Sequence, residues 1–203
     1  HPCFTSGDFS KDDCGIGGTL GYNQSCVWSW RWTSDTSDID RQCSIKFSTS
    51  YEATNSMFQD IAVLSEAEYD QRESTGTLLI IPIQSSSTTG PLNIYPTFSE
   101  SQPFIADLDY TMYINYYNIG NGLFDDLTGK ISLTVPNNIN LNCKDYGSDF
   151  VLDKELIFIK GRALRSECNF TTSSVSTMDI KPLTITATYK YILYNSIPIT
   201  VKA

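Results

Sequence analysis

The segment 131–203 alternates apolar and polar residues over several short runs, and this pattern constrains the fold more than any other feature of the chain. In the run 131–135 the odd positions are Ile, Leu and Val and the even positions are Ser and Thr, and the runs 185–191 and 197–202 repeat the alternation. A period of two places alternate side chains on opposite faces of a β-strand, so each run predicts a strand with one buried and one exposed face. The run 156–159 is apolar throughout and predicts a more central strand.

The chain before residue 131 predicts further short strands and one helix. Ser65-Glu-Ala-Glu68 matches a capping box with Ser65 as N-cap, so we expect a helix of about two turns that ends near Glu73. The remaining runs predict strands at 27–32, 43–47, 58–64 and 77–83. Many short strands with turn residues between them favour β-sandwiches over a parallel α/β sheet. We therefore expect an all-β fold of two β-sandwich, immunoglobulin-like units with one short helix, stapled by disulfides.

Composition divides the chain into three expected segments. Ser85–Pro91 is low in complexity and contains Gly-Pro, so it is the best linker candidate. We expect a cysteine-containing N-terminal segment at 1–25, a first β domain with the short helix at 26–90, and an immunoglobulin-like β-sandwich at 91–203. The last segment lacks the tryptophan and the cysteine spacing of antibody domains, so the expectation concerns architecture alone. The alternative is that both halves share one sheet.

The six cysteines are an even number without a CxxC motif, and the chain has a single histidine, which favours disulfides over a zinc site. They are Cys3, Cys14, Cys26, Cys43, Cys143 and Cys168. The first four allow three pairings, of which we prefer the most local, Cys3–Cys14 with Cys26–Cys43. A Cys143–Cys168 pair would close a loop of about 26 residues and contribute about 3.5 kcal/mol on the chain-entropy model. Disulfides indicate an oxidising, extracellular setting.

Two sequons and the acidic composition agree with a secreted protein that does not bind nucleic acid. Asn23-Gln-Ser and Asn169-Phe-Thr match the N-glycosylation motif. Fourteen basic against 23 acidic residues give a net charge of −9, which argues against a phosphate backbone or an anionic membrane surface as partner. No apolar run approaches the ~18–20 residues that a membrane span needs. A chain that opens on His1 fits both a mature secreted product and a shortened chain.

The titratable residues form no recognisable catalytic or cofactor-binding pattern, so we expect neither an enzyme nor a cofactor. The chain has one histidine, whereas a nucleophile–base pair needs a base of near-neutral pKa. Acid-pair glycoside hydrolysis would need two carboxylates, and Asp107 and Asp109 are spaced to share one face of a strand, where a solvated edge is the commoner role. Weak calcium candidates are Asp8, Asp12 and Asp13; they do not complete an EF-hand pattern, and solvated turns are the alternative.

All three tryptophans lie in one predicted strand, at Trp28, Trp30 and Trp32. On an exposed face, three aligned indoles would form a stacking platform for sugar rings. On a buried face they would belong to the core, where large aromatic side chains usually lie.

The succession ISLTVPNN…LNC…ELIFIKG…SECNF…ITATYKY…IPITVKA in the segment 131–203 resembles a module of secreted or cell-surface proteins of archaea. The stretch DIAVLSEAEYDQ at 60–71 is similar to the strand-then-helix element that often precedes this module. The shared motifs are structural. The resemblance implies an immunoglobulin-like β-sandwich outside the cell, acting as a building block of coats, filaments or adhesive appendages.

These observations lead to one expected function and one alternative. We expect a structural subunit of an extracellular assembly, such as a filament, a pilus-like fibre or a surface layer, whose partners are copies of itself. Open sandwiches leave strand edges that an extended segment of a neighbouring subunit can complete. The alternative is an adhesin module that binds cell-surface glycans or host proteins, with its tryptophans exposed.

Thiol titration tests the expected pairing of all six cysteines. The unreduced protein, unfolded in guanidinium chloride, should show no thiol that reacts with Ellman's reagent, and six should appear after reduction. Two or more reactive thiols before reduction would contradict the disulfide hypothesis and, with it, the extracellular location.

Overall fold

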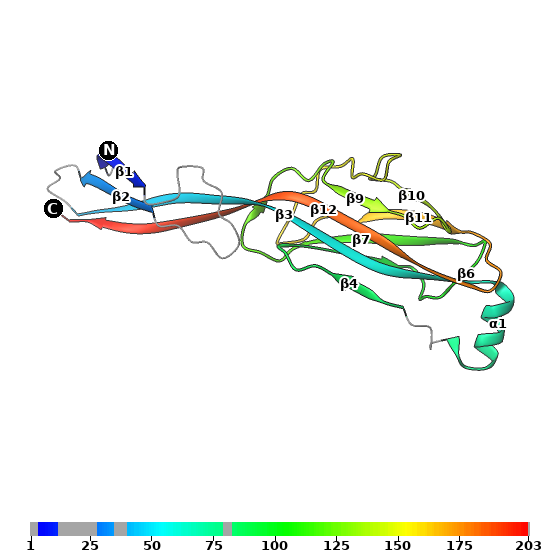
Figure 1. Ribbon diagram of the computed structural model, residues 1–203. Helices are drawn as coiled ribbons and strands as arrows, with labels where there is room; N and C mark the ends of the chain where they lie inside the picture. The colour runs from blue at the N-terminus through cyan, green and yellow to red at the C-terminus, as the bar shows by residue number, and fades with distance from the viewer. Residues whose placement is uncertain (1–3, 12–27, 35–39, 79–82, 203) are drawn as a thin grey trace. The chain divides into compact units, whose positions relative to one another are not determined.

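The computed structural model consists mainly of β-strands, with a single helix in the residues that it describes, 4–11, 28–34, 40–78 and 83–202 (Figure 1). The expected all-β class is therefore confirmed. In chain order the elements are β1 (Phe4–Lys11), β2 (Trp28–Ser34), β3 (Arg41–Leu64), α1 (Glu66–Ser74), β4 (Ser85–Ser87), β5 (Leu92–Phe98), β6 (Phe104–Ile105), β7 (Asp109–Asn118), β8 (Leu123–Phe124), β9 (Ile131–Thr134), β10 (Ile139–Cys143), β11 (Ser166–Thr172) and β12 (Met178–Val201).

The chain divides into two compact units. The first consists of His1–Ser48 and Tyr194–Ala203, and the second of Thr49–Leu193. Strands β3 and β12 are each 24 residues long and contribute residues to both units. This division differs from the three consecutive segments expected at 1–25, 26–90 and 91–203. The reason is that strands from both sides of residue 90 build the second unit.

In the first unit, β1 and β2 form an antiparallel pair that places Phe9 opposite Trp30. Strand β2 corresponds to the strand predicted at 27–32. Cys43 on β3 is buried and takes part in a disulfide, whose other half lies outside the described residues. The preferred pairings, Cys3–Cys14 and Cys26–Cys43, therefore stay predictions.

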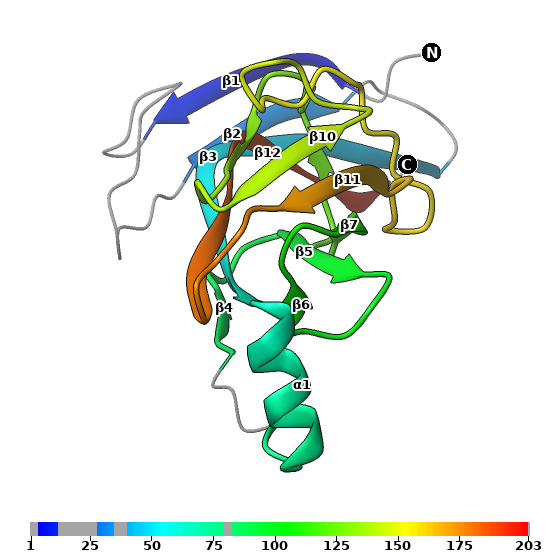
Figure 2. The ribbon, with the colours of Figure 1, turned by 90° about the vertical axis from the view of Figure 1, so that its right-hand side faces the viewer.

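The second unit contains two sheets. In the sheet that we call the front sheet, β10, β11, β7 and β5 are neighbours in this order and are antiparallel throughout. The back sheet has the order β4-β3-β12-β8; β9 also pairs with β12, and the two-residue β6 runs parallel to the end of β3. Helix α1 follows β3 and projects from the same end of the unit as β6 (Figures 1 and 2).

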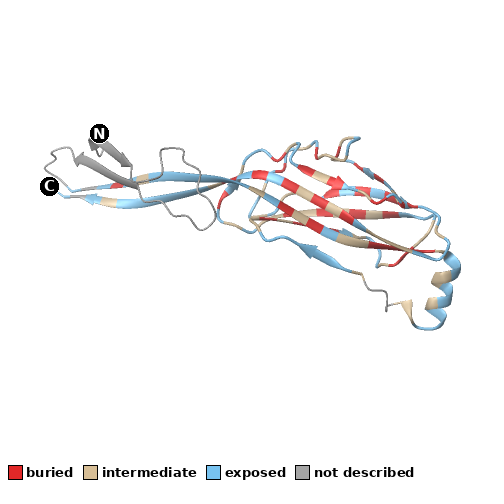
Figure 3. Ribbon diagram, viewed as in Figure 1, coloured by how far each residue is buried: buried red, intermediate tan, exposed pale blue. Residues whose placement is uncertain are grey.

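One hydrophobic cluster joins the inner faces of the two sheets. Front strand β7 contributes Met112 and Ile114, and back strand β12 contributes Ile185, all with at most 1% of their surface exposed. Buried residues alternate with partly buried or exposed ones along these strands (Figure 3). The alternation that predicted strands at 131–135 and 185–191 therefore reflects a buried and an exposed face.

Helix α1 begins where the capping box predicts. The hydroxyl of Ser65 accepts a hydrogen bond from the backbone N–H of Glu68 at 3.3 Å. The Glu68 carboxylate does not return to the backbone of Ser65; it pairs instead with Arg72 one turn later, at 2.6 Å between Oε1 and Nε. The Ser65 cap is thus confirmed, while an i,i+4 ion pair stands in place of the second half of the capping box.

Two pairs of predicted strands prove to be single long strands. The runs 43–47 and 58–64 belong to β3, and the runs 185–191 and 197–202 belong to β12. Residues 46–52 of β3 are all exposed, so no apolar alternation marks the strand there. A hydrophobic pattern reveals only the part of a strand that buries one of its faces.

The apolar run 156–159 is not the central strand that its composition predicts. Leu156 is buried, but Ile157 and Ile159 are 66% and 71% exposed, and the run has only an isolated bridge between Ile159 and Arg162. Burial still alternates along the run, since Leu156 is buried and Phe158 packs against the core while Ile157 and Ile159 are exposed, but the run belongs to neither sheet. The strand predicted at 77–83 lies largely outside the described residues.

The expected linker Ser85–Pro91 is part of the second unit and contacts strand β3. Its first three residues form β4, which pairs with Met57–Gln59 of β3. The buried side chain of Asn55 donates from Nδ2 to the carbonyl of Thr88 at 3.4 Å. Gly90 lies so close that a Cβ added to it would be 2.3 Å from the Asn55 side chain. Ser85–Pro91 therefore lies within the second unit, as a short strand followed by a turn, and does not link the two units.

Replacing Asn55 tests how much this attachment stabilises the fold. Its Oδ1 also accepts a hydrogen bond from the buried Tyr189 hydroxyl, which in turn accepts from the backbone N–H of Leu92 at 3.3 Å. Asn55→Ala removes the acceptor of the buried Tyr189 hydroxyl and the side-chain donor to Thr88, so the free energy of unfolding should fall by about 1–3 kcal/mol in urea. Thr54→Ala, at the exposed neighbouring position, should change it by less than about 0.5 kcal/mol. Equal effects of the two substitutions would contradict the assignment.

Candidate functional site

The outward face of the front sheet carries a distinctive set of amide, hydroxyl, tyrosine and arginine side chains. In β7 the even residues 110–116 are buried and the odd residues lie on the other face. Strand β11 behaves in the same way, with Cys168 and Phe170 buried and Glu167 and Asn169 exposed. Because the strands are in register, the outward residues form rows across the sheet.

Two of these rows form what we call the amide–hydroxyl surface. In the first row, Asn142 of β10 is opposite Asn169 of β11, which is opposite Thr111 of β7. The second row lies two positions further along each strand. It consists of Asn140, Thr171 and Asp109.

The six residues of the amide–hydroxyl surface line an open hollow of about 430 Å³. Thr111 Oγ1 donates to Asn169 Oδ1 at 3.3 Å, and Thr171 Oγ1 donates to a carboxylate oxygen of Asp109. The side chains of Asn140 and Asn142 have no hydrogen-bond partner among the described residues. The hollow therefore presents unused amide donors and acceptors to a ligand with hydroxyl groups.

A second group on the same face forms what we call the Tyr–Arg surface. The guanidinium carbon of Arg165 lies 3.8 Å from the ring centre of Tyr113, and that of Arg162 lies 5.3 Å from the ring centre of Tyr117. Tyr117 stacks on Tyr95 of β5, with ring centres 5.5 Å apart and planes inclined by 9°. These are cation–π and stacking geometries, which hold the side chains in defined orientations.

A tight turn places Arg162 beside Tyr117. Ile159 and Arg162 exchange backbone hydrogen bonds of 2.8 and 3.1 Å around Lys160-Gly161, whose φ angles of 51° and 79° are both positive, as a type I′ turn requires. Tyr117 then pairs with Arg162 as a β-bridge.

A side-chain hydrogen bond with Tyr117 and, to a smaller extent, burial raise the pKa of Tyr95.

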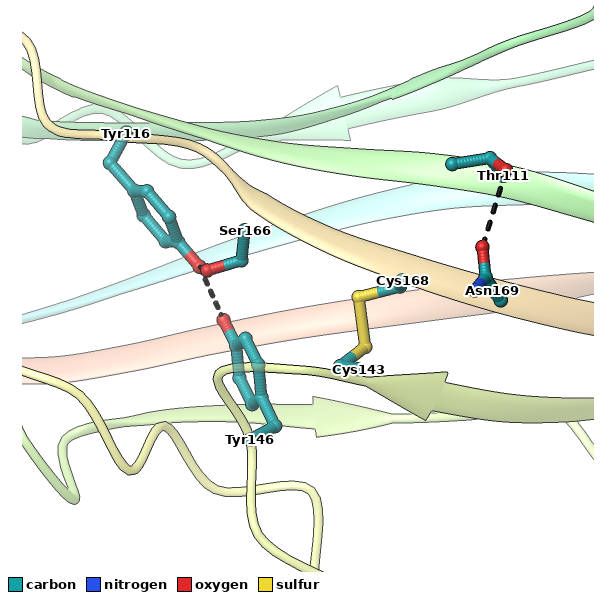
Figure 4. Close-up of a disulfide and its surroundings, with 7 residues drawn as sticks. All are labelled: Thr111, Tyr116, Cys143, Tyr146, Ser166, Cys168 and Asn169. Atoms are coloured by element: carbon teal, nitrogen blue, oxygen red, sulfur yellow. Dashed lines mark hydrogen bonds between the residues drawn. A yellow bond between two sulfur atoms is a disulfide. The ribbon is translucent and has the colours of Figure 1, made fainter.

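On the core side of the same strands, a disulfide joins Cys143 of β10 to Cys168 of β11, as the sequence led us to expect (Figure 4). The two cysteines are directly opposite each other, and the pair next to them is Asn142 and Asn169. The disulfide therefore fixes the register of the first amide row. Its sequence separation of 25 implies a contribution of about 3.5 kcal/mol to stability on the chain-entropy model.

A buried hydroxyl cluster links the same strands nearby (Figure 4). The Tyr116 hydroxyl donates to Ser166 Oγ at 2.9 Å and lies 2.8 Å from the Tyr146 hydroxyl, from which it accepts. Burial raises the pKa of Tyr116 to about 12 and that of Tyr146 well above its usual value. The cluster ties β7, β11 and the segment after β10 together beneath the outward face.

Several predicted site residues lie outside what the structure describes. Trp28, Trp30 and Trp32 are on β2, but only the backbone of this strand is described, so the accessibility of the indoles stays a prediction. The same holds for Asp8 on β1. Entirely outside the described residues are Cys3, Cys14, Cys26, Asp12, Asp13 and Asn23.

The prediction that Asp107 and Asp109 share a strand face is wrong. Asp109 is the first residue of β7, whereas Asp107 precedes the strand with a φ of 60°. The Asp107 carboxylate accepts from the Ser174 hydroxyl, at 2.8 and 2.7 Å to its two oxygens, and Asp109 accepts from Thr171. Because the backbone turns at Asp107, the two carboxylates have different partners.

Sequence reasoning missed most of the candidate site. The i,i+2 spacing of Asn140 with Asn142, and of Asn169 with Thr171, was a usable signal for outward strand positions. What joins them with β7 is the register between strands that are distant in the sequence, which the pattern does not contain.

Nowhere in the described part of the chain do three or more His, Cys, Asp or Glu side chains form a group that could hold a metal ion. No helix in the same residues has the length and hydropathy needed to cross a membrane.

No protein-family model matches the chain, and neither a curated protein nor a solved structure matches it.

The raised pKa of Tyr116 predicts how stability depends on alkaline pH. The folded state keeps this proton above pH 10, where the unfolded state releases it, so the stabilisation is complete below pH 10 and is lost as pH rises toward 12. Between pH 9 and 11 the urea-unfolding free energy of the wild type should fall by about 1 kcal/mol more than that of Tyr116→Phe. The control is Tyr194→Phe, at an exposed position, which should follow the wild type. Parallel curves for wild type and Tyr116→Phe would contradict the assignment.

Proposed function

We propose that the chain is a structural subunit of an extracellular assembly, a filament, fibre or surface layer, and that its second unit is an immunoglobulin-like β-sandwich. The sandwich is supported by two sheets that share one core. The extracellular setting is supported by the Cys143–Cys168 disulfide and by the disulfide of Cys43. The resemblance of 131–203 to modules of archaeal surface proteins points the same way. The proposal includes no catalytic step and no cofactor.

The Tyr–Arg surface is the observation that carries this proposal. Tyrosine and arginine are enriched at protein–protein interfaces, where they act as anchors. Arg162 and Arg165 are exposed, and their contacts with Tyr117 and Tyr113 order them before a partner arrives, which lowers the entropic cost of binding. With a net charge of −9, a second copy of the chain presents an excess of carboxylates to these two guanidinium groups.

The strand edges of the front sheet support a second contact between subunits, by strand donation. Among the described residues, β5 and β10 are its outer strands. Pro96 lies in the middle of β5 and has no N–H to offer to an added strand. Strand β10 contains no proline and is the better acceptor for an extended segment of a neighbouring subunit.

A glycan- or host-binding adhesin is the second candidate function. The hollow of the amide–hydroxyl surface and the stacked rings of Tyr95 and Tyr117 favour it, because sugars bind through hydroxyl hydrogen bonds and ring stacking. The two functions differ in the state of the purified protein. An adhesin module has no need to polymerise, whereas a structural subunit does.

Electron microscopy and sedimentation of the wild type and two charge-reversal variants test the proposal. The wild type should form polymers at high concentration, and Arg165→Glu should raise the concentration needed at least about tenfold, the cost of an interface anchor. Lys190→Glu makes the same change in charge at an exposed position of β12 in the back sheet and should assemble like the wild type. A wild type that stays monomeric, with no polymers in the images, would contradict the structural role.

A further inference from the structure

We propose that Asn169 carries an N-linked glycan and that the amide–hydroxyl surface is the cradle for its first sugars. The inference rests on the extracellular setting of the proposed function, but it does not depend on polymer formation. It assigns a covalent occupant to the hollow that Asn140, Asn142, Asp109, Thr111, Asn169 and Thr171 line.

The fold presents the sequon in the way that a modified asparagine requires. Asn169 and Thr171 are both exposed on the outward face of β11, while Phe170 between them is buried in the core. A glycan on Asn169 therefore extends into solvent and displaces no core residue. A sequon whose asparagine pointed inward would be incompatible with the folded unit.

The hydrogen bonding of Asn169 leaves the reactive atom available. Its Oδ1 accepts from Thr111 Oγ1 at 3.3 Å, which fixes the plane of the amide (Figure 4). Its Nδ2, the atom to which an N-glycan is attached, has no acceptor among the described residues. The modification therefore keeps the one hydrogen bond that the amide oxygen accepts from β7 and breaks none made by Nδ2.

The covalent step is an ordinary glycosyl transfer. The donor is an oligosaccharide linked through pyrophosphate to a lipid. A bond forms between Nδ2 of Asn169 and the anomeric carbon of the first sugar, and the bond from that carbon to the pyrophosphate oxygen breaks. Nδ2 loses one proton, and the lipid pyrophosphate leaves.

The neighbours of Asn169 are suited to hold the attached sugar. Asn142 lies directly opposite on β10, and Asn140 lies in the next row; both side chains are exposed and have no partner among the described residues. The Asp109 carboxylate adds an acceptor at the far end of that row. The hollow of about 430 Å³ is open to solvent, so an attached sugar can lie along it and continue outward.

A disulfide on the core side of the sheet fixes two of the strands that form the cradle. The Cys143–Cys168 disulfide lies one residue from the pair Asn142–Asn169, on the core side of the same two strands. A sugar on Asn169 therefore meets Asn142 at a constant spacing. This rigidity lowers the entropic cost of contacts between the glycan and the sheet.

Glycopeptide mass spectrometry tests the attachment. The full chain is secreted from an N-glycosylating eukaryotic host, reduced and cleaved with trypsin. The mass of the peptide that begins at Ser166 is then measured. It should carry a hexose-containing mass increment in the wild type and in Thr171→Ser, which keeps the sequon and its hydroxyl. The increment should be absent from Thr171→Val and Asn169→Gln. An unmodified Asn169 in the secreted wild type would overturn the inference.

The assembly assay on the same preparations separates this inference from the proposed function. Polymers formed by a chain with unmodified Asn169 would overturn the glycan inference and leave the structural role standing. A glycosylated chain that stays monomeric would support the glycan inference and contradict the structural role.

Thermal unfolding tests the cradle itself. The glycan should raise the melting temperature of the wild type relative to Asn169→Gln, and Asn142→Ala should abolish most of that increase. In the Asn169→Gln background, Asn142→Ala should have little effect. The matched control is Asn93→Ala, on the outward side of β5, which should leave the increase intact. An equal increase with and without Asn142 would show an attached but uncradled glycan and would overturn this part of the inference.

Discussion

The register between β10, β11 and β7 is the constraint on which the front sheet depends. A strand has two faces, so a slip of one residue between β10 and β11 would turn the amides of Asn140 and Asn142 toward the core and Cys143 toward solvent. The disulfide makes that slip impossible on one side of β11, and the hydrogen bond from Tyr116 to Ser166 opposes it on the other. The bonds on the core side of the sheet therefore determine which side chains lie on its outward face.

The sequence predicted those parts of the fold in which a local pattern is also a structural rule. The cap at Ser65, the strand at 131–135 and the cysteine pair Cys143–Cys168 follow from spacing along the chain. The length of β3 could not be predicted, because residues 46–52 are all exposed and show no alternation. The irregular structure of 156–159 could not be predicted either. An apolar run has the same sequence pattern in a central strand as in an irregular segment whose isoleucines are exposed.

The candidate site was harder to predict for a different reason. Its rows combine residues from β7, β10 and β11, and only their pairing brings Thr111, Asn142 and Asn169 together. The segment before Pro91 likewise resembles a linker in sequence, because its hydrogen-bond partner Asn55 is distant along the chain. Polar residues signal a surface or a turn, but they do not tell which distant element provides their partner.

Pro96 has a consequence for any fibre built from this unit. It lies in β5, one outer strand of the front sheet in the described residues, whereas β10 at the opposite side has no proline. If strand pairing joins the copies, each copy is extended through one side only. Such a chain of subunits is polar: its two ends expose different surfaces, and it grows and sheds subunits at different rates at the two ends.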